Sequence, residues 1–157
     1  MTGISSLASS LRVSREKTVP VGSALVGSED FIQESRRFRK QFGGSMRQAG
    51  IIASAALHAL ENHRERLTED HQNAKDLALG LVEIPGIIID PVEVETNIVY
   101  FGVKGLEASV FQQKLEEHNV RLLTSWKDTI RAVTNLMVNS KQIRETLQAV
   151  RMVMREA

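Results

Sequence analysis

The sequence predicts an α/β fold in which a small, mostly antiparallel sheet carries helices on one face and is preceded by long helices. From Ile87 onward, β-branched runs and amphipathic segments alternate in the order strand, strand, helix, strand, strand, helix. Before Ile87 the spacing is mainly helical, with one strand-like run at residues 19–26. Apolar residues make up 42% of the 157 residues, enough for a buried core.

Residues 1–18 are expected to form a disordered tail before the strand at 19–26. This tail is rich in Ser and contains Arg12 and Arg15, which also resembles a mitochondrial presequence. Because a disordered tail is the favoured interpretation, we expect a cytoplasmic location, and the presequence-like composition keeps the mitochondrion as the alternative. The next element is a helix over residues 28–41, which begins with acidic and ends with basic residues.

Two glycines then interrupt the chain at residues 43–44. They predict a turn that leads into a second helix, with Ser45 as its N-cap and Arg47 in its first turn. Exposed amides and basic side chains in such a turn suit an anion, while a solvated turn beside a basic face is the alternative. The helix expected over residues 49–60 carries no charged residue, so we expect it to pack against a missing domain or another subunit.

A further helix is predicted over residues 64–82, with residues 69–71 (Glu-Asp-His) on its solvated face. Its apolar stripe consists of Leu67, Ala74, Leu77, Ala78 and Leu81. We treat residues 19–82 as a connecting segment and residues 83–157 as a small α/β domain. The elements expected in that domain are strands at 87–89, 97–103, 120–123 and 130–134, a helix at 107–118 with Val110 facing inward, and a last helix capped by Ser140.

Arg131 is the strongest single candidate for a binding residue. It lies within a strand pattern that places Ile130, Ala132 and Thr134 on one face and Arg131 and Val133 on the other. An arginine buried without a partner is costly, and its planar guanidinium suits a carboxylate. The alternative is an edge-strand arginine that reaches solvent.

Composition argues against several other functions. A net charge of +1 disfavours general nucleic-acid binding, although the basic residues 36–40 keep it as a distant alternative. The absence of cysteine excludes disulfides and thiol chemistry. No apolar run approaches the roughly 18–20 residues of a membrane span, and the four histidines show no metal-ligand spacing, so we expect neither a membrane segment nor a metal site.

Three motifs occur in the order found in one enzyme family. Residues 20–23 read Pro-Val-Gly-Ser, residues 37–40 read Arg-Phe-Arg-Lys, and residues 43–48 read Gly-Gly-Ser-Met-Arg-Gln. They resemble the low-specificity L-threonine aldolases, which depend on pyridoxal 5'-phosphate and have the fold-type I, aspartate aminotransferase-like architecture. The resemblance runs from about Pro20 to the C-terminus and corresponds to the C-terminal part of a family member. It implies a truncated chain that lacks the large cofactor-binding portion.

The resemblance also implies roles for individual residues. Arg131 would hold the α-carboxylate of the substrate, while Lys40 and Arg47 would reach the cofactor phosphate across a subunit interface. The position of the lysine that forms the Schiff base is occupied by Arg15, whose guanidinium does not form an aldimine. Lys17 lies two positions out of register and is a poor substitute.

Two classes of function follow. The first is a pyridoxal-phosphate lyase lineage that cleaves L-threonine or L-allo-threonine to glycine and acetaldehyde, with this chain alone expected to be inactive. The second is a non-catalytic relative that serves as an interaction or oligomerisation module through residues 49–60. A homo-oligomer is expected in either case.

Overall fold

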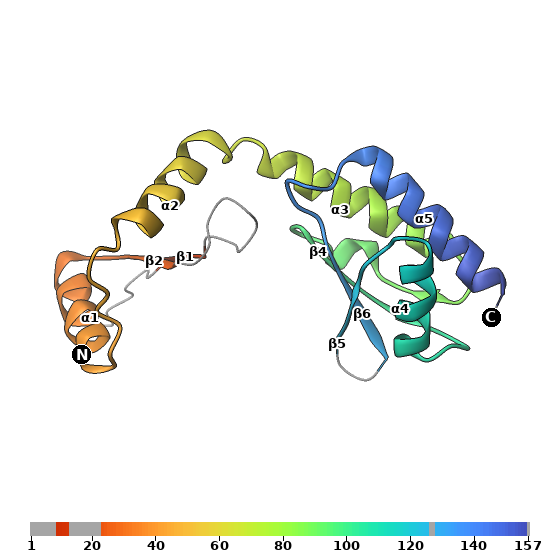
Figure 1. Cartoon of the computed structure of the whole chain (residues 1–157), viewed down its shortest axis with the longest axis horizontal. Coiled ribbons are helices and arrows are strands. Elements are labelled where there is room, and N and C mark those ends of the chain that lie inside the picture. The colour runs from red at the N-terminus through yellow and green to blue at the C-terminus, as the bar shows by residue number, and fades with distance from the viewer. Residues whose placement is uncertain (1–8, 13–22, 126–127, 157) are drawn as a thin grey trace. The chain divides into compact units, whose positions relative to one another are not determined.

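The computed structural model describes residues 9–12, 23–125 and 128–156. The chain divides into two compact units, Met1–Arg64 and Glu65–Ala157, shown in Figure 1. The predictions for Arg15, for Lys17 and for residues 19–22 lie outside the described residues. Of the disordered tail expected over residues 1–18, the structure describes only residues 9–12, which form a strand.

The first unit contains one pair of short antiparallel strands and two helices. Strand β1 (Ser9–Arg12) pairs antiparallel with β2 (Ser23–Val26), and helices α1 (Glu29–Gln41) and α2 (Gly50–Asn62) follow. Helix α1 begins where expected, because the Ser28 hydroxyl accepts a hydrogen bond from the Phe31 amide at 3.4 Å. Neither helix has a buried residue.

The turn between α1 and α2 corrects the prediction for Ser45. The Gly44 amide donates to the Arg39 carbonyl at 2.8 Å and the Gly43 amide donates to the Lys40 carbonyl at 3.2 Å. Gly43 has φ +76°, so these bonds form the Schellman motif that ends α1. The two glycines therefore terminate the first helix rather than introduce the second, which begins at Gly50 with Ala49 as its N-cap and without a side-chain cap.

The second unit is built on a four-stranded sheet with the spatial order β3-β4-β6-β5, in which every pairing is antiparallel. Its strands are β3 (Ile87–Ile88), β4 (Ile98–Val103), β5 (Leu123–Ser125) and β6 (Thr129–Val133), with a short 3-10 helix, η1 (Pro91–Glu93), before β4. The expected α/β fold class is confirmed.

Three helices cover one face of this sheet: α3 (Leu67–Val82), α4 (Ala108–Glu117) and α5 (Ser140–Arg155). Helices α3 and α5 pack side by side (Figure 1). The buried core between helices and sheet includes Val99, Phe101 and Ile130 from the strands, and Phe111 and Leu81 from the helices. Tyr100 and Leu123, which point to the opposite face, are exposed.

Four smaller expectations are wrong. The strand expected at 120–123 begins only at Leu123, because residues 120–122 do not pair with β6. Asn139, rather than Ser140, caps α5, and it forms a capping box with Gln142. Val110, which lies beside the apolar stripe of α4, and Leu67, which is the first residue of α3, are both exposed.

Candidate functional site: the open face of the sheet

Arg131 lies on an inner strand of the sheet, on the face that no described helix of this unit covers. Strand β6 pairs on both sides, and Arg131 lies opposite Tyr100 of β4 and Leu123 of β5. Ile130, Ala132 and Thr134 are buried, whereas Arg131 and Val133 are half-buried. The predicted alternation is confirmed, and it directs the Arg131 side chain to the open face.

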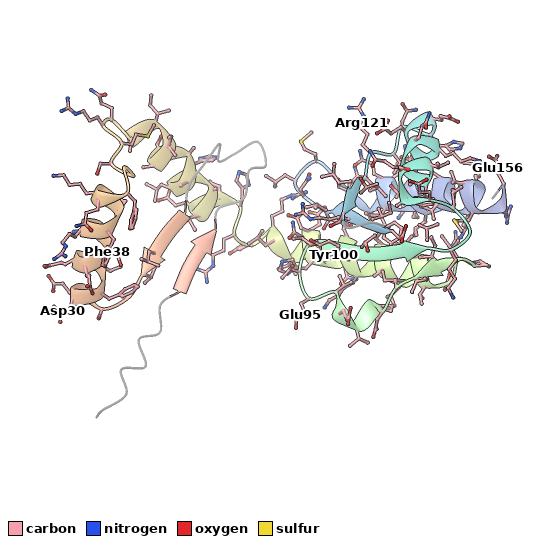
Figure 2. The ribbon with its side chains drawn as sticks, turned by 90° about the horizontal axis from the view of Figure 1, so that it is seen from below. Asp30, Phe38, Glu95, Tyr100, Arg121 and Glu156 are labelled. Carbon is pink, nitrogen blue, oxygen red and sulfur yellow. The ribbon has the colours of Figure 1, made fainter. Side chains whose placement is uncertain are left out.

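The two residues directly opposite Arg131 carry uncharged side chains. The side chains directly opposite, Tyr100 and Leu123, are 52% and 60% exposed and stand on the same face; Tyr100 is labelled in Figure 2. The Nε atom of Arg131 is buried and has no hydrogen-bond partner among the described residues. An unsatisfied buried donor on a permanently charged group is costly, so an acceptor that reached this N–H would remove that cost.

The strand that carries Arg131 is held at its C-terminal end by a buried polar network. Thr134 is 2% exposed, and its amide donates to the Asn97 carbonyl at 3.0 Å. Asn97 Nδ2 donates in return to the Thr134 carbonyl at 2.8 Å. The Thr134 hydroxyl donates to the Asp70 carbonyl at 2.7 Å, which ties the end of β6 to the first turn of α3.

Side chains at the start of α3 hold the loop that follows β6. Asp70 is 5% exposed and accepts a hydrogen bond from Arg66 Nη1 at 2.9 Å. Arg66 Nη2 also donates to the Leu136 carbonyl at 3.3 Å, and Asn73 Nδ2 donates to the Val138 carbonyl at 3.1 Å. The expectation that residues 69–71 form a solvated helix face is therefore wrong for Asp70.

Sequence reasoning missed this network because most of its partners are far apart in the chain. Asn73 and Val138 are 65 positions apart, and Arg66 and Leu136 are 70 apart. One local signal was present: Arg66 stands four residues before Asp70, a spacing that places opposite charges together on a helix.

The two predicted anion-binding residues lie in the first unit. Lys40 is in the last turn of α1 and is exposed. Arg47 is exposed in the turn that precedes α2, three positions before the first helical residue. The prediction that Arg47 lies in the first turn of α2 is therefore wrong: Gln48 has φ +50°, and α2 begins only at Gly50. These two residues and Arg131 fall in separate units.

Within the described ranges, no group of three or more His, Asp or Glu side chains is arranged to hold a metal ion. No helix among the described residues is both long and apolar enough to cross a membrane.

Comparison with known proteins identifies relatives. The beta-eliminating lyase family model matches residues 7–104. Low-specificity L-threonine aldolase 1 of Arabidopsis thaliana is 36% identical over 138 residues, which cover 86% of this chain and 38% of that protein. Low specificity L-threonine aldolase of Escherichia coli strain K12 is 39% identical over 126 residues, which cover 80% of this chain and 36% of that protein.

A solved structure shares the fold. The structure of MppP soaked with the product 2-ketoarginine aligns with a TM-score of 0.58 at 15% identity, covering 84% of this chain and 40% of that one. The chain spans a little over a third of the length of the two aldolases above. On the strength of the family match and of these relatives, the chain belongs to the beta-eliminating lyase family and to a threonine-aldolase-like lineage.

Proposed function

We propose that this chain supplies the carboxylate-binding part of a threonine-aldolase-like protein and does not complete the lyase reaction by itself. The observation that carries the proposal is the buried, unpaired Nε of Arg131 on the open face of the sheet. The planar guanidinium suits the α-carboxylate of an amino acid such as L-threonine or L-allo-threonine. In the lineage, that substrate would be cleaved to glycine and acetaldehyde.

The residues of this chain fit the substrate carboxylate better than they fit pyridoxal phosphate. Lys40 and Arg47 are exposed, and the helix that follows them has no side-chain cap and begins at Gly50. By the resemblance to the aldolases, Arg15 would occupy the position of the Schiff-base lysine. The described residues therefore form no cradle for the cofactor, and we derive no step through it.

Carboxylate binding is tested on Arg131 itself. In a ¹⁵N-labelled chain, added L-threonine or glycine is expected to shift the Nε–Hε resonance of Arg131, because the carboxylate supplies the missing acceptor. Replacing Arg131→Gln should abolish saturable binding, whereas replacing the exposed Arg144→Gln on α5 should leave it unchanged. A titration that moves no resonance on the open face would reject the carboxylate role.

The absence of activity is tested separately. The purified chain is incubated with pyridoxal phosphate, reduced with borohydride and mapped by mass spectrometry, and acetaldehyde release from L-threonine is assayed in parallel. We expect scattered adducts on surface lysines and no cleavage, because a guanidinium at position 15 does not form a Schiff base. A stoichiometric adduct on Lys17 together with cleavage of L-threonine would overturn this part of the proposal.

A second function, assembly through α2, is favoured by a different observation. Helix α2 has no buried residue, and Ile51 and Leu57 are 83% and 55% exposed. Exposed apolar surface on a helix, here over the uncharged residues 50–60 of α2, is typical of an interface, and we propose a second copy of the chain as the partner. Light scattering should show an oligomer that Leu57→Glu dissociates, whereas Leu79→Glu, which replaces a leucine 57% exposed on α3, should not. A monomeric parent chain would exclude this assembly.

A further inference from the structure

Tyr100 is the residue of β4 that lies directly opposite Arg131, and the hydrogen bonding of the ladder defines the type of this pair. The Thr134 amide donates to the Asn97 carbonyl at 3.0 Å, so Asn97 and Thr134 form a hydrogen-bonded pair. Hydrogen-bonded and non-hydrogen-bonded pairs alternate along an antiparallel ladder. Three positions further along the same ladder, Tyr100 and Arg131 therefore form a non-hydrogen-bonded pair.

This type of pair brings the two side chains close together. The Cα atoms of a non-hydrogen-bonded pair are about 4.5 Å apart, compared with about 5.5 Å in a hydrogen-bonded pair. Because the backbone groups of Arg131 face β5, its pair with Leu123 is a hydrogen-bonded one. Side chains stand roughly perpendicular to a sheet, and those of tyrosine and arginine are both long. Tyr100 is therefore the nearer of the two cross-strand neighbours of the Arg131 side chain.

Arg131 and Tyr100 each present a hydrogen-bond donor on the open face. The Nε–H of Arg131 is buried and has no partner in the described part of the chain. Tyr100 is 52% exposed, and its hydroxyl forms no hydrogen bond with any other described residue. A carboxylate has two oxygen atoms and can accept from both donors at once.

We propose that Tyr100 is a second binding residue of the carboxylate site. Its hydroxyl donates to one oxygen of the ligand carboxylate while the Nε–H of Arg131 donates to the other. This inference rests on the proposed function of Arg131, and it adds β4 to the site. Two donors on neighbouring strands fix the orientation of the carboxylate as well as its position. The ligand class is a small carboxylate, of which the amino acid glycine is the simplest probe.

The first test uses a single fluorine label. Tyr100 is the only tyrosine of the sequence, so 3-fluorotyrosine incorporated in place of tyrosine reports on this position alone. The full ¹⁵N-labelled chain is titrated with glycine, and the ¹⁹F resonance and the Arg131 Nε–Hε resonance are followed together. We expect both resonances to shift with the same Kd. Glycinamide, which lacks the carboxylate, should shift neither of them, and Arg131→Gln should abolish the ¹⁹F shift.

Two variants test the hydroxyl itself. Tyr100→Phe keeps the aromatic ring and should weaken glycine binding about five-fold, as expected for the loss of one hydrogen bond, while Arg131 Nε–Hε still shifts at saturation. The control is Ile88→Ala, which changes a β3 residue that is 51% exposed on the same face and should leave the Kd unchanged.

The outcomes separate this inference from the proposed function. A Kd that Tyr100→Phe leaves unchanged, or a ¹⁹F resonance that stays fixed while Arg131 Nε–Hε shifts, would overturn the role of Tyr100 and leave the carboxylate function of Arg131 standing. If neither resonance shifts in the parent chain, the carboxylate function fails and the role of Tyr100 fails with it.

Discussion

The ion pair between Arg66 and Asp70 should stabilise the second unit much more than the pair between Lys141 and Glu145. Both pairs span four helical positions with the basic residue first, at 2.9 Å and 3.5 Å. Their side chains differ in exposure: 26% and 7% for Arg66 and Asp70, but 78% and 56% for Lys141 and Glu145. Burial is the largest difference between these two pairs of equal spacing.

The expected magnitude follows from the distance and the burial. Two unit charges 2.9 Å apart attract by about 6 kcal/mol at an effective dielectric constant near 20. Desolvation of the Asp70 carboxylate offsets much of this attraction, which leaves a coupling energy of about 1–3 kcal/mol. The exposed pair on α5 should couple by only about 0.3–0.5 kcal/mol.

A double-mutant cycle measures both couplings. Urea unfolding of Arg66→Met, Asp70→Asn and the double variant is compared with the matching cycle of Lys141→Met and Glu145→Gln. Arg66→Met should be the most destabilising single change, because it leaves a buried carboxylate without its cationic partner. Equal coupling energies for the two pairs would refute the argument from burial.

Two further predictions concern backbone positions. Replacing Gly43→Ala should destabilise the end of α1 by about 1 kcal/mol, because residue 43 has φ +76°. Replacing Gly50→Ala should be neutral or stabilising, because an added Cβ would enter open space. Hydrogen exchange of the α1 and α2 amides measures both effects. Replacing Asn139→Ala should lower the free energy of unfolding of the second unit by about 1 kcal/mol, because the capping box is lost, whereas Ser140→Ala should change it by less than about 0.5 kcal/mol. Urea unfolding measures both. A larger loss of stability in Ser140→Ala than in Asn139→Ala would mean that Ser140 is the cap.

The sheet of the second unit was predictable because its signal is local. Alternation in residues 130–134 is enough to separate the core face from the open face, and the burial of Ile130 and Ala132 follows it. The capping error at α5 arose because two neighbouring residues could each serve as the cap. Asn139 and Ser140 are both good caps, and only the backbone angles of the formed helix distinguish them.

The buried polar residues were not predictable from periodicity. A helical pattern assigns Asp70 to the polar face, and it contains no information on a carbonyl such as that of Leu136. The pairing of Arg66 with Asp70 follows from spacing, but the burial of Asp70 depends on the loop that the end of β6 places above it. Such sites need the tertiary structure, because their partners converge only when the sheet has formed.

The register of β6 connects this buried network to the proposed carboxylate site. A slip of β6 by one residue would turn Arg131 into the core and expose Ile130 and Ala132, because side chains alternate with a period of two. The slip is opposed from both sides: Thr134 is fixed to Asn97 and to the start of α3, and a guanidinium in the apolar core would be costly. The residues that keep Arg131 on the open face therefore lie at the end of β6 and in the core, and they act by fixing which residue of β6 lies opposite Tyr100.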